Sequence, residues 1–143
     1  MGDRRPAKGT RGACGTGIYG IGIDLVEVRR LEKTAARRGQ RFLDRVFTAG
    51  ELAYCGQGPQ RFRRLAARFA AKEAVLKALG TGLRQASWTD VEIEHDELGR
   101  PLVRLGGGVA ELAGRAGVAQ VLLTLSHTDQ YGAAQAVALR GGE

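Results

Sequence analysis

The chain has 143 residues, of which 43% are hydrophobic, and this composition is typical of one folded domain. No stretch approaches the roughly 20 apolar residues of a membrane-spanning helix. The N-terminus does not resemble a signal peptide, so we expect a cytoplasmic protein. The net charge of +7 is concentrated in residues 29–77, with 13 Lys and Arg against 4 Asp and Glu. A surface of this kind attracts nucleic acid, a phosphorylated small molecule or an acidic protein. The alternative interpretation is that these charges only solvate the exposed faces of helices.

The first predicted element is a strand over residues 18–25. Residues 1–17 lack periodicity and predict a loose tail, so the domain is expected over 18–143. Within the strand, Gly20 and Gly22 alternate with apolar residues, and glycines on one face indicate the close approach of another element. Helices are then predicted over 26–37, 41–46, 49–55 and 60–79. Thr48 and Glu51 fit a capping box for the third of these helices.

The longest helix, 60–79, places its apolar residues on one stripe and stops at Gly80. Beyond it the pattern changes to strands with one helix. Strands are predicted over 91–94 and 101–105, a helix over 109–116, and two strands over 120–127 and 131–139. This order of elements predicts the α+β class in a single domain.

Asp24 ends the first strand, and its neighbours on the same face are glycines. An open niche beside a carboxylate could hold a metal ion. However, Asp24 followed by Glu27 also fits a capping box at the start of the next helix. Taken alone, the residues favour the cap.

Glu73 lies at the edge of the apolar stripe of the longest helix, with Lys77 one turn later. The pair could be an ordinary helical ion pair. It could also be a second acidic metal ligand with a lysine placed for a phosphate, because Mg²⁺ is held by one or two carboxylates plus phosphate oxygens and water. Gly80, Thr81 and Gly82 follow, either as a helix stop or as a loop whose N–H groups reach an anion.

The residues resemble bacterial holo-acyl-carrier-protein synthase, the small 4′-phosphopantetheinyl transferase. The resemblance covers residues 18–139, and its most specific block is the sequence RFAAKEA over 68–74. It is carried by four segments, which are 20–24 with Glu27 and Arg30, 68–82, 99–101, and 126–128 with Tyr131.

This resemblance implies a reaction and a fold. The family transfers 4′-phosphopantetheine from coenzyme A to a serine of apo-acyl carrier protein and releases 3′,5′-ADP. Its fold is a small antiparallel sheet packed with a long central helix and shorter helices. It is typically a homotrimer with sites at subunit interfaces. No membrane or nucleic acid is expected as a partner, and the carrier could serve fatty-acid or polyketide synthesis.

The resemblance also implies roles for residues. Asp24 and Glu73 resemble the Mg²⁺ ligands, and Lys77 would reach the pyrophosphate. The serine proton would pass to Glu73 or to a metal-bound water, and Mn²⁺ stays open as an alternative metal. Arg30 would dock the acidic carrier protein. Candidates for the nucleotide and its 3′-phosphate are Arg68, Gly80, Thr81, Gly82 and His127.

Two other classes of function fit the residues less well. A basic nucleic-acid-binding module would explain the arginines, but it has few aromatics for stacking and leaves Asp24 and Glu73 unexplained. A metal-free scaffold subunit would use both acids only as caps and ion pairs. A mass gain on a carrier protein incubated with coenzyme A and Mg²⁺ would separate these classes from the transferase.

Overall fold

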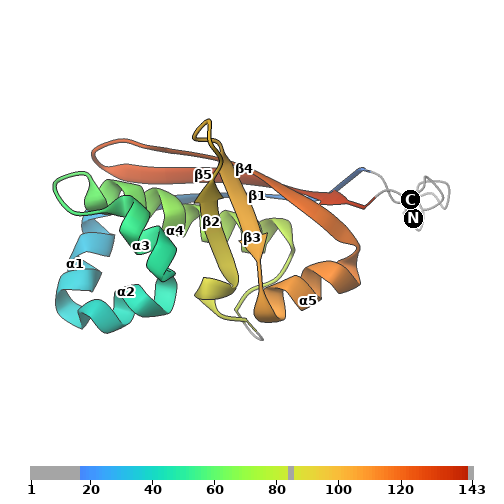
Figure 1. The fold of residues 1–143 in the computed structure, drawn as a ribbon, viewed down its shortest axis with the longest axis horizontal. Coiled ribbons are helices and arrows are strands. Elements are labelled where there is room, and N and C mark those ends of the chain that lie inside the picture. Colours follow the sequence, from blue (N-terminus) through green and yellow to red (C-terminus); the bar gives the residue numbers. More distant parts are fainter. Residues whose placement is uncertain (1–16, 84–85, 142–143) are drawn as a thin grey trace, which may run out of the picture.

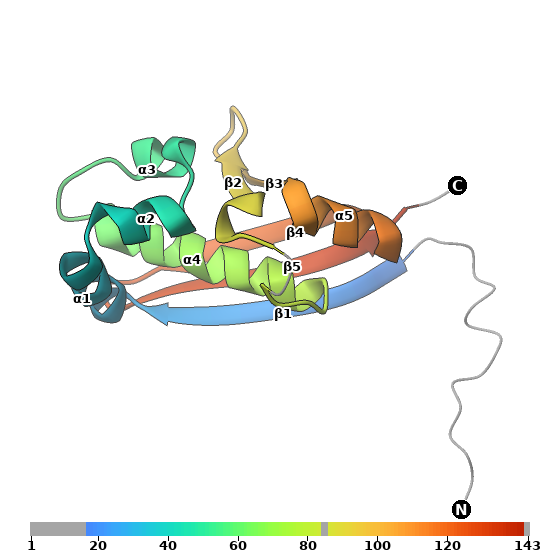
Figure 2. The same ribbon diagram turned by 90° about the horizontal axis from the view of Figure 1, so that it is seen from below.

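The fold places one long helix between a sheet and a layer of shorter elements. The computed structural model describes residues 17–83 and 86–141. Figure 2 shows helix α4 (Arg61–Ala78) lying along one face of the sheet. The sheet is antiparallel, in the spatial order β1 (Gly17–Glu27), β5 (Tyr131–Arg140), β4 (Val118–His127). The predicted α+β class, with a small antiparallel sheet on a long central helix, is therefore confirmed.

The shorter elements lie on the side of α4 that faces away from the sheet (Figures 1 and 2). They are α1 (Val28–Arg38), α2 (Gln40–Val46), α3 (Ala49–Cys55), the 3₁₀ turn η2 (Trp88–Asp90), β2 (Val91–His95), β3 (Pro101–Leu105) and α5 (Gly107–Ala116). Every predicted helix and strand is present. Strand β1 begins at Gly17, one residue before its predicted start, and the predicted tail otherwise lies outside the described residues. Within the described ranges, none of the helices is long and apolar enough to span a membrane.

Strand β1 continues further than the sequence predicts. Glu27 still pairs with Tyr131, and the Val28 N–H donates to the carbonyl of Gln130 at 2.9 Å. Helix α1 therefore begins only at Val28, and its N-cap residue Glu27 makes no side-chain cap. The predicted helix start at residue 26 and the capping box at Asp24 are both wrong, because sheet pairing holds this segment extended.

Glycines allow α4 to lie directly against the sheet. A Cβ atom on Gly20 would lie 2.1 Å from the carbonyl oxygen of Ala78, and one on Gly22 would lie 2.0 Å from that of Ala74. Gly132 of β5 is equally close to the α4 backbone. The close approach that the two glycines of β1 predict is confirmed, and any larger residue would push the strand from the helix.

Helix α4 is buried on most of its circumference. The sequence predicts one apolar stripe, and this prediction is wrong, because even Arg68 and Lys72 are buried. The sheet covers one side of the helix, while α3 and β2 cover the other. A helix that is covered on both sides needs small or fully paired side chains rather than a polar outer face.

Candidate active site

Asp24 on β1 and Glu73 on α4 lie with their carboxyl groups beside one another. Burial raises the pKa of Glu73 to about 7, and hydrogen bonding to Asp24 and its negative charge add to this. The Asp24 side chain is 13% exposed, and Glu73 is also only partly exposed. Two carboxylates that repel one another, both partly removed from water, form a site that a cation would stabilise.

The alternation of β1 explains why these two side chains meet. Gly20, Gly22 and Asp24 occupy the same face of the strand, which is the face against α4. Gly22 contacts the α4 backbone at Ala74, the residue next to Glu73. The close packing of strand and helix therefore brings the side chain two residues after Gly22 to the carboxyl group of Glu73.

Lys77 joins the two acids from the next turn of α4. Its Nζ donates to Asp24 Oδ1 at 2.9 Å and to the carbonyl oxygen of Ile23 at 3.0 Å. The lysine is thus turned toward β1 rather than held along the helix by Glu73, although its charge lowers the pKa of Glu73 against the larger raising effects. The Lys77 side chain is 54% exposed, so its ammonium group is accessible to a ligand from solvent.

The donors at this site fit a hard divalent cation. In residues 17–83 and 86–141, no cluster of three or more His, Cys, Asp and Glu side chains could hold a metal. Mg²⁺ does not need such a cluster, because it keeps several waters and completes its six ligands with substrate phosphates. Two carboxylates without sulfur or imidazole suit Mg²⁺ or Mn²⁺.

The loop after α4 is first a helix stop. Gly80 has a φ of 73°, and its N–H donates to the carbonyl of Lys77 at 3.0 Å. The Thr81 N–H donates to Leu76 at 3.0 Å, which completes a Schellman ending and confirms the predicted stop. Two N–H groups of the loop are therefore used by the helix end itself. A nucleotide contact by Gly80, Thr81 or Gly82 stays a prediction.

Arg68 lies apart from the carboxylates, on the side of α4 that faces α3 and β2. Its guanidinium carbon is 4.4 Å from the centre of the Tyr54 ring, and Nη2 is 3.4 Å from His95 Nδ1. The rings of Tyr54 and His95 stack at 4.3 Å. Burial and the charge of Arg68 lower the pKa of His95. Sequence reasoning missed this cluster, because nothing local indicates that α3 and β2 meet here.

Arg68 is buried, and its Nε has no hydrogen-bond partner in the described structure. Lys77 lies nine positions after Arg68, which is about 14 Å along the helix. His127 is exposed at the end of β4, opposite Gly132. A single chain therefore brings Asp24, Glu73 and Lys77 together. Arg68 and His127, which are predicted to contact the nucleotide, lie elsewhere in the same chain.

Arg30 is exposed on α1, on a basic surface. It lines a hollow of about 410 Å³. The hollow is formed by Glu27, Arg29, Arg30, Lys33, Thr34 and Arg37. Carrier docking there stays a prediction.

The comparisons with known proteins identify the family. The model of the 4′-phosphopantetheinyl transferase superfamily matches residues 20–136. The chain belongs to this superfamily, and it is a phosphopantetheinyl transferase. Two similar relatives are holo-[acyl-carrier-protein] synthases. That of Chloroflexus aurantiacus is 45% identical over 84% of this chain and 97% of its own length. That of Moorella thermoacetica is 48% identical over 81% of this chain and 90% of its own length.

Solved structures agree with this assignment. The synthase from Neisseria meningitidis has a TM-score of 0.78 and 37% identity, over 85% of this chain and 98% of that one. The Helicobacter pylori synthase in complex with coenzyme A has a TM-score of 0.74 and 29% identity, over 82% of this chain and 98% of that one. The resemblance seen in the sequence is confirmed, and the transferase is favoured over the nucleic-acid-binding module and the metal-free scaffold.

Proposed function

We propose that the chain transfers the 4′-phosphopantetheine arm of coenzyme A to a serine of apo-acyl carrier protein at the group formed by Asp24, Glu73 and Lys77. The observation that carries this assignment is the pairing of two partly buried carboxyl groups from different elements. Asp24 does not cap a helix, and its carboxylate is shared between the Lys77 ammonium group and Glu73, the other two members of this group. The relatives' names and the coenzyme A complex of one of them support the substrates.

In this proposal Asp24 and Glu73 hold Mg²⁺, which when bound neutralises charge on the pyrophosphate of coenzyme A. Lys77 binds the same pyrophosphate through its accessible ammonium group. The serine Oγ attacks the β-phosphorus, its proton passes to Glu73 or to water, and the bond to the departing 3′,5′-ADP breaks. Lys77 offsets the charge that the departing phosphate gains, so its contact is strongest in the transition state.

Arg68, His127 and the loop of Gly80, Thr81 and Gly82 are proposed to hold the nucleotide. Because Arg68 lies about 14 Å from Lys77 along α4, we propose that the site is completed between subunits of a homotrimer. The outer face of the sheet supports an assembly, since Ile21, Ile23 and Leu25 of β1 are each more than 60% exposed. Large apolar surfaces of this kind usually mark an interface.

Arg30 and its basic neighbours on α1 are proposed to dock the acidic carrier protein. The test of the whole proposal is incubation of the protein with coenzyme A, Mg²⁺ and an apo-carrier protein, followed by intact mass spectrometry. We expect the carrier to gain the mass of one phosphopantetheine arm, and only when a divalent metal is present. An unchanged carrier mass with active coenzyme A would contradict the proposal.

A further inference from the structure

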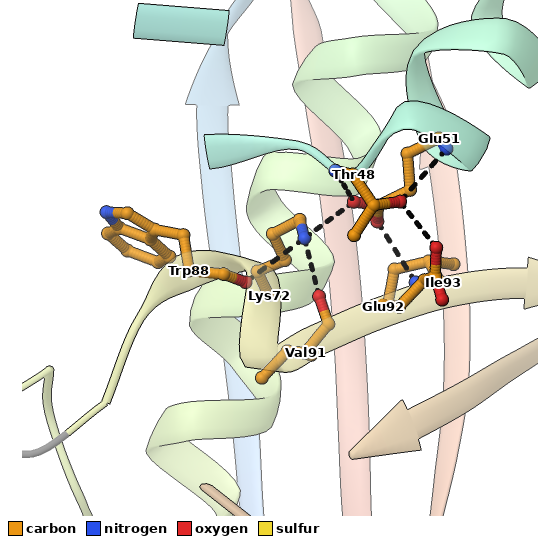
Figure 3. Close-up of polar contacts among 7 residues, drawn as sticks. All are labelled: Thr48, Glu51, Lys72, Trp88, Val91, Glu92 and Ile93. Carbon is orange, nitrogen blue, oxygen red and sulfur yellow. Dashed lines mark hydrogen bonds and ion pairs between the residues drawn. The ribbon is translucent and has the colours of Figure 1, made fainter. Parts of the chain in front are cut away.

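Lys72 is fully buried on the side of α4 that faces away from the sheet. Its Nζ lies 2.7 Å from Glu51 Oε1, and neither side chain has any exposed surface. The same ammonium group donates to the carbonyl oxygens of Val91 and Trp88, the latter at 3.2 Å (Figure 3). A lysine ammonium has three donors, so each has an acceptor within the protein.

Both carboxylate oxygens of Glu51 also accept hydrogen bonds from backbone N–H groups. One carboxylate oxygen accepts from the N–H of Thr48 at 2.9 Å and the other accepts from the N–H of Ile93 at 3.0 Å. The capping box of α3 and the start of β2 are therefore tied to α4 through one ion pair. Burial of such a pair gives little net stability compared with apolar residues, so its presence calls for another explanation.

On the sheet side of α4, the half-exposed Lys77 bonds to Asp24 and to the Ile23 carbonyl, and the rest of that face offers few features that would fix the rotation of the helix. There the helix presents alanines such as Ala74 and Ala78 to the glycines of β1. Side chains this small form only low ridges, so they restrict the rotation of a helix less than large interdigitating side chains do. The Lys72–Glu51 pair is fully buried and makes directional bonds to backbone atoms of Thr48, Val91 and Ile93, and buried polar groups fix the register of elements in some proteins.

We propose that the Lys72–Glu51 ion pair fixes the rotation of α4, so that Lys72 is a positioning residue for Glu73. Lys72 and Glu73 are adjacent and project about 100° apart, so any rotation that loosens one moves the other. A rotation of about 20° would shift the Glu73 carboxylate by roughly 2 Å relative to Asp24. Metal sites tolerate only about 0.2 Å in ligand distance. The inference rests on the proposed metal site.

The test removes both charges at similar volume, with Lys72→Met and Glu51→Gln in one protein. Each variant is studied with coenzyme A, at a temperature where it is fully folded. We expect Mn²⁺ binding, followed by electron paramagnetic resonance, to weaken about 10- to 100-fold, and turnover to fall by a similar factor. The KM for carrier protein should not change, because α1 is untouched. The matched control is Val109→Ala, a fully buried site on α5, which lowers the unfolding temperature and should leave metal binding unchanged.

Two outcomes would overturn the positioning role. One is wild-type Mn²⁺ binding and turnover in the double variant, and the other is an equal defect in Val109→Ala at a matched unfolding temperature. If the double variant does not fold, Glu51→Asp retracts the carboxylate by one methylene and should show a smaller loss of the same kind. Asp24→Asn, measured in parallel, separates the two proposals. If it binds Mn²⁺ normally, the proposed metal site itself is wrong.

Discussion

Helix α4 carries two lysines that each pair with a carboxylate, and the two pairs differ in almost every other respect. Lys72 and Glu51 are sealed from water, and the three ammonium donors and both carboxylate oxygens have partners within the protein. Lys77 and Asp24 form their pair at the surface, where the lysine is half exposed and a second carboxylate, Glu73, stands alongside. The closed pair has no capacity left for a ligand, whereas the open pair does.

This difference shows that adjacent residues of the RFAAKEA block, residues 68–74, can have different roles. Lys72 and Glu73 are neighbours in sequence, yet Lys72 is paired inside the protein, while Glu73 belongs to the metal site that we propose. A carboxylate that is left incompletely paired costs stability, and it persists where a ligand completes it. The open pair should therefore be replaceable with little loss of stability, while changes around it should remove activity.

The largest effect is expected from the open side of this comparison. Asp24→Ala and Glu73→Ala should each reduce transfer by about a thousandfold or more, because losing a metal ligand removes several kcal/mol of transition-state stabilisation. Thermal unfolding should show little loss, since Asp24 caps no helix. Single-turnover transfer to apo-carrier protein measures the rate. If Asp24→Ala lowers the unfolding temperature but transfers at the wild-type rate, the Lys77–Asp24 pair has a structural role instead.

Gly22→Ala should damage both regions together. The new Cβ would meet the carbonyl oxygen of Ala74 and push β1 from α4. We expect a loss of about 1–3 kcal/mol in the free energy of unfolding. Transfer should also fall, because Asp24 moves away from Glu73. The control is Gly114→Ala on α5, where a Cβ meets nothing within 4 Å and should stabilise the helix by about 1 kcal/mol. Chemical denaturation that ranks the two variants equally would rule out this account.

Lys77→Ala tests whether the open lysine serves the ligand or only Asp24. We expect turnover and coenzyme A affinity each to fall by about 10- to 100-fold, since the contact grows stronger as the leaving phosphate gains charge. Lys77→Arg should restore part of the activity, because a planar fork replaces a compact charge. Steady-state kinetics with varied coenzyme A measures both effects. Wild-type values for both constants in Lys77→Ala would leave the residue as a surface partner of Asp24.

The smallest effect is expected at the basic surface of α1, which lies outside both pairs. Arg30→Glu should raise the KM for carrier protein by about tenfold and make this KM less dependent on salt concentration. Coenzyme A affinity should not change. Arg115→Glu on α5 makes the same change of charge at a distant exposed site and serves as the control. Equal effects of the two variants would mean that only net charge matters.

Local signals in the sequence were sufficient for most of the fold. The capping box of Thr48 and Glu51 and the stop at Gly80 are predicted correctly, because neighbours in the chain make those contacts. The end of β1 is not predicted, because β5, far along the chain, holds that strand extended. Glu51 is read as a cap alone, since its bond to Ile93 and its pair with Lys72 depend on tertiary packing.

For the site, the residues alone left Asp24 between a cap and a metal ligand. The family resemblance favoured the ligand, and the structure removed the cap. Nothing in the local sequence could show that Lys77 reaches Asp24 across to β1, or that Arg68 packs on Tyr54. Helical spacing suggested instead that Lys77 pairs with Glu73, which is the nearer residue in sequence but not the one it contacts.

The outer face of β1 has a thermodynamic consequence for the site. Ile23 and Leu25, which flank Asp24 in sequence, point away from α4 and are largely exposed in the single chain. In the proposed trimer, whatever covers these two side chains also steadies the strand that holds Asp24. Linkage then requires reciprocity, so metal and coenzyme A should tighten subunit association by the same factor by which association tightens their binding. Dilution of the protein would therefore weaken its hold on both ligands.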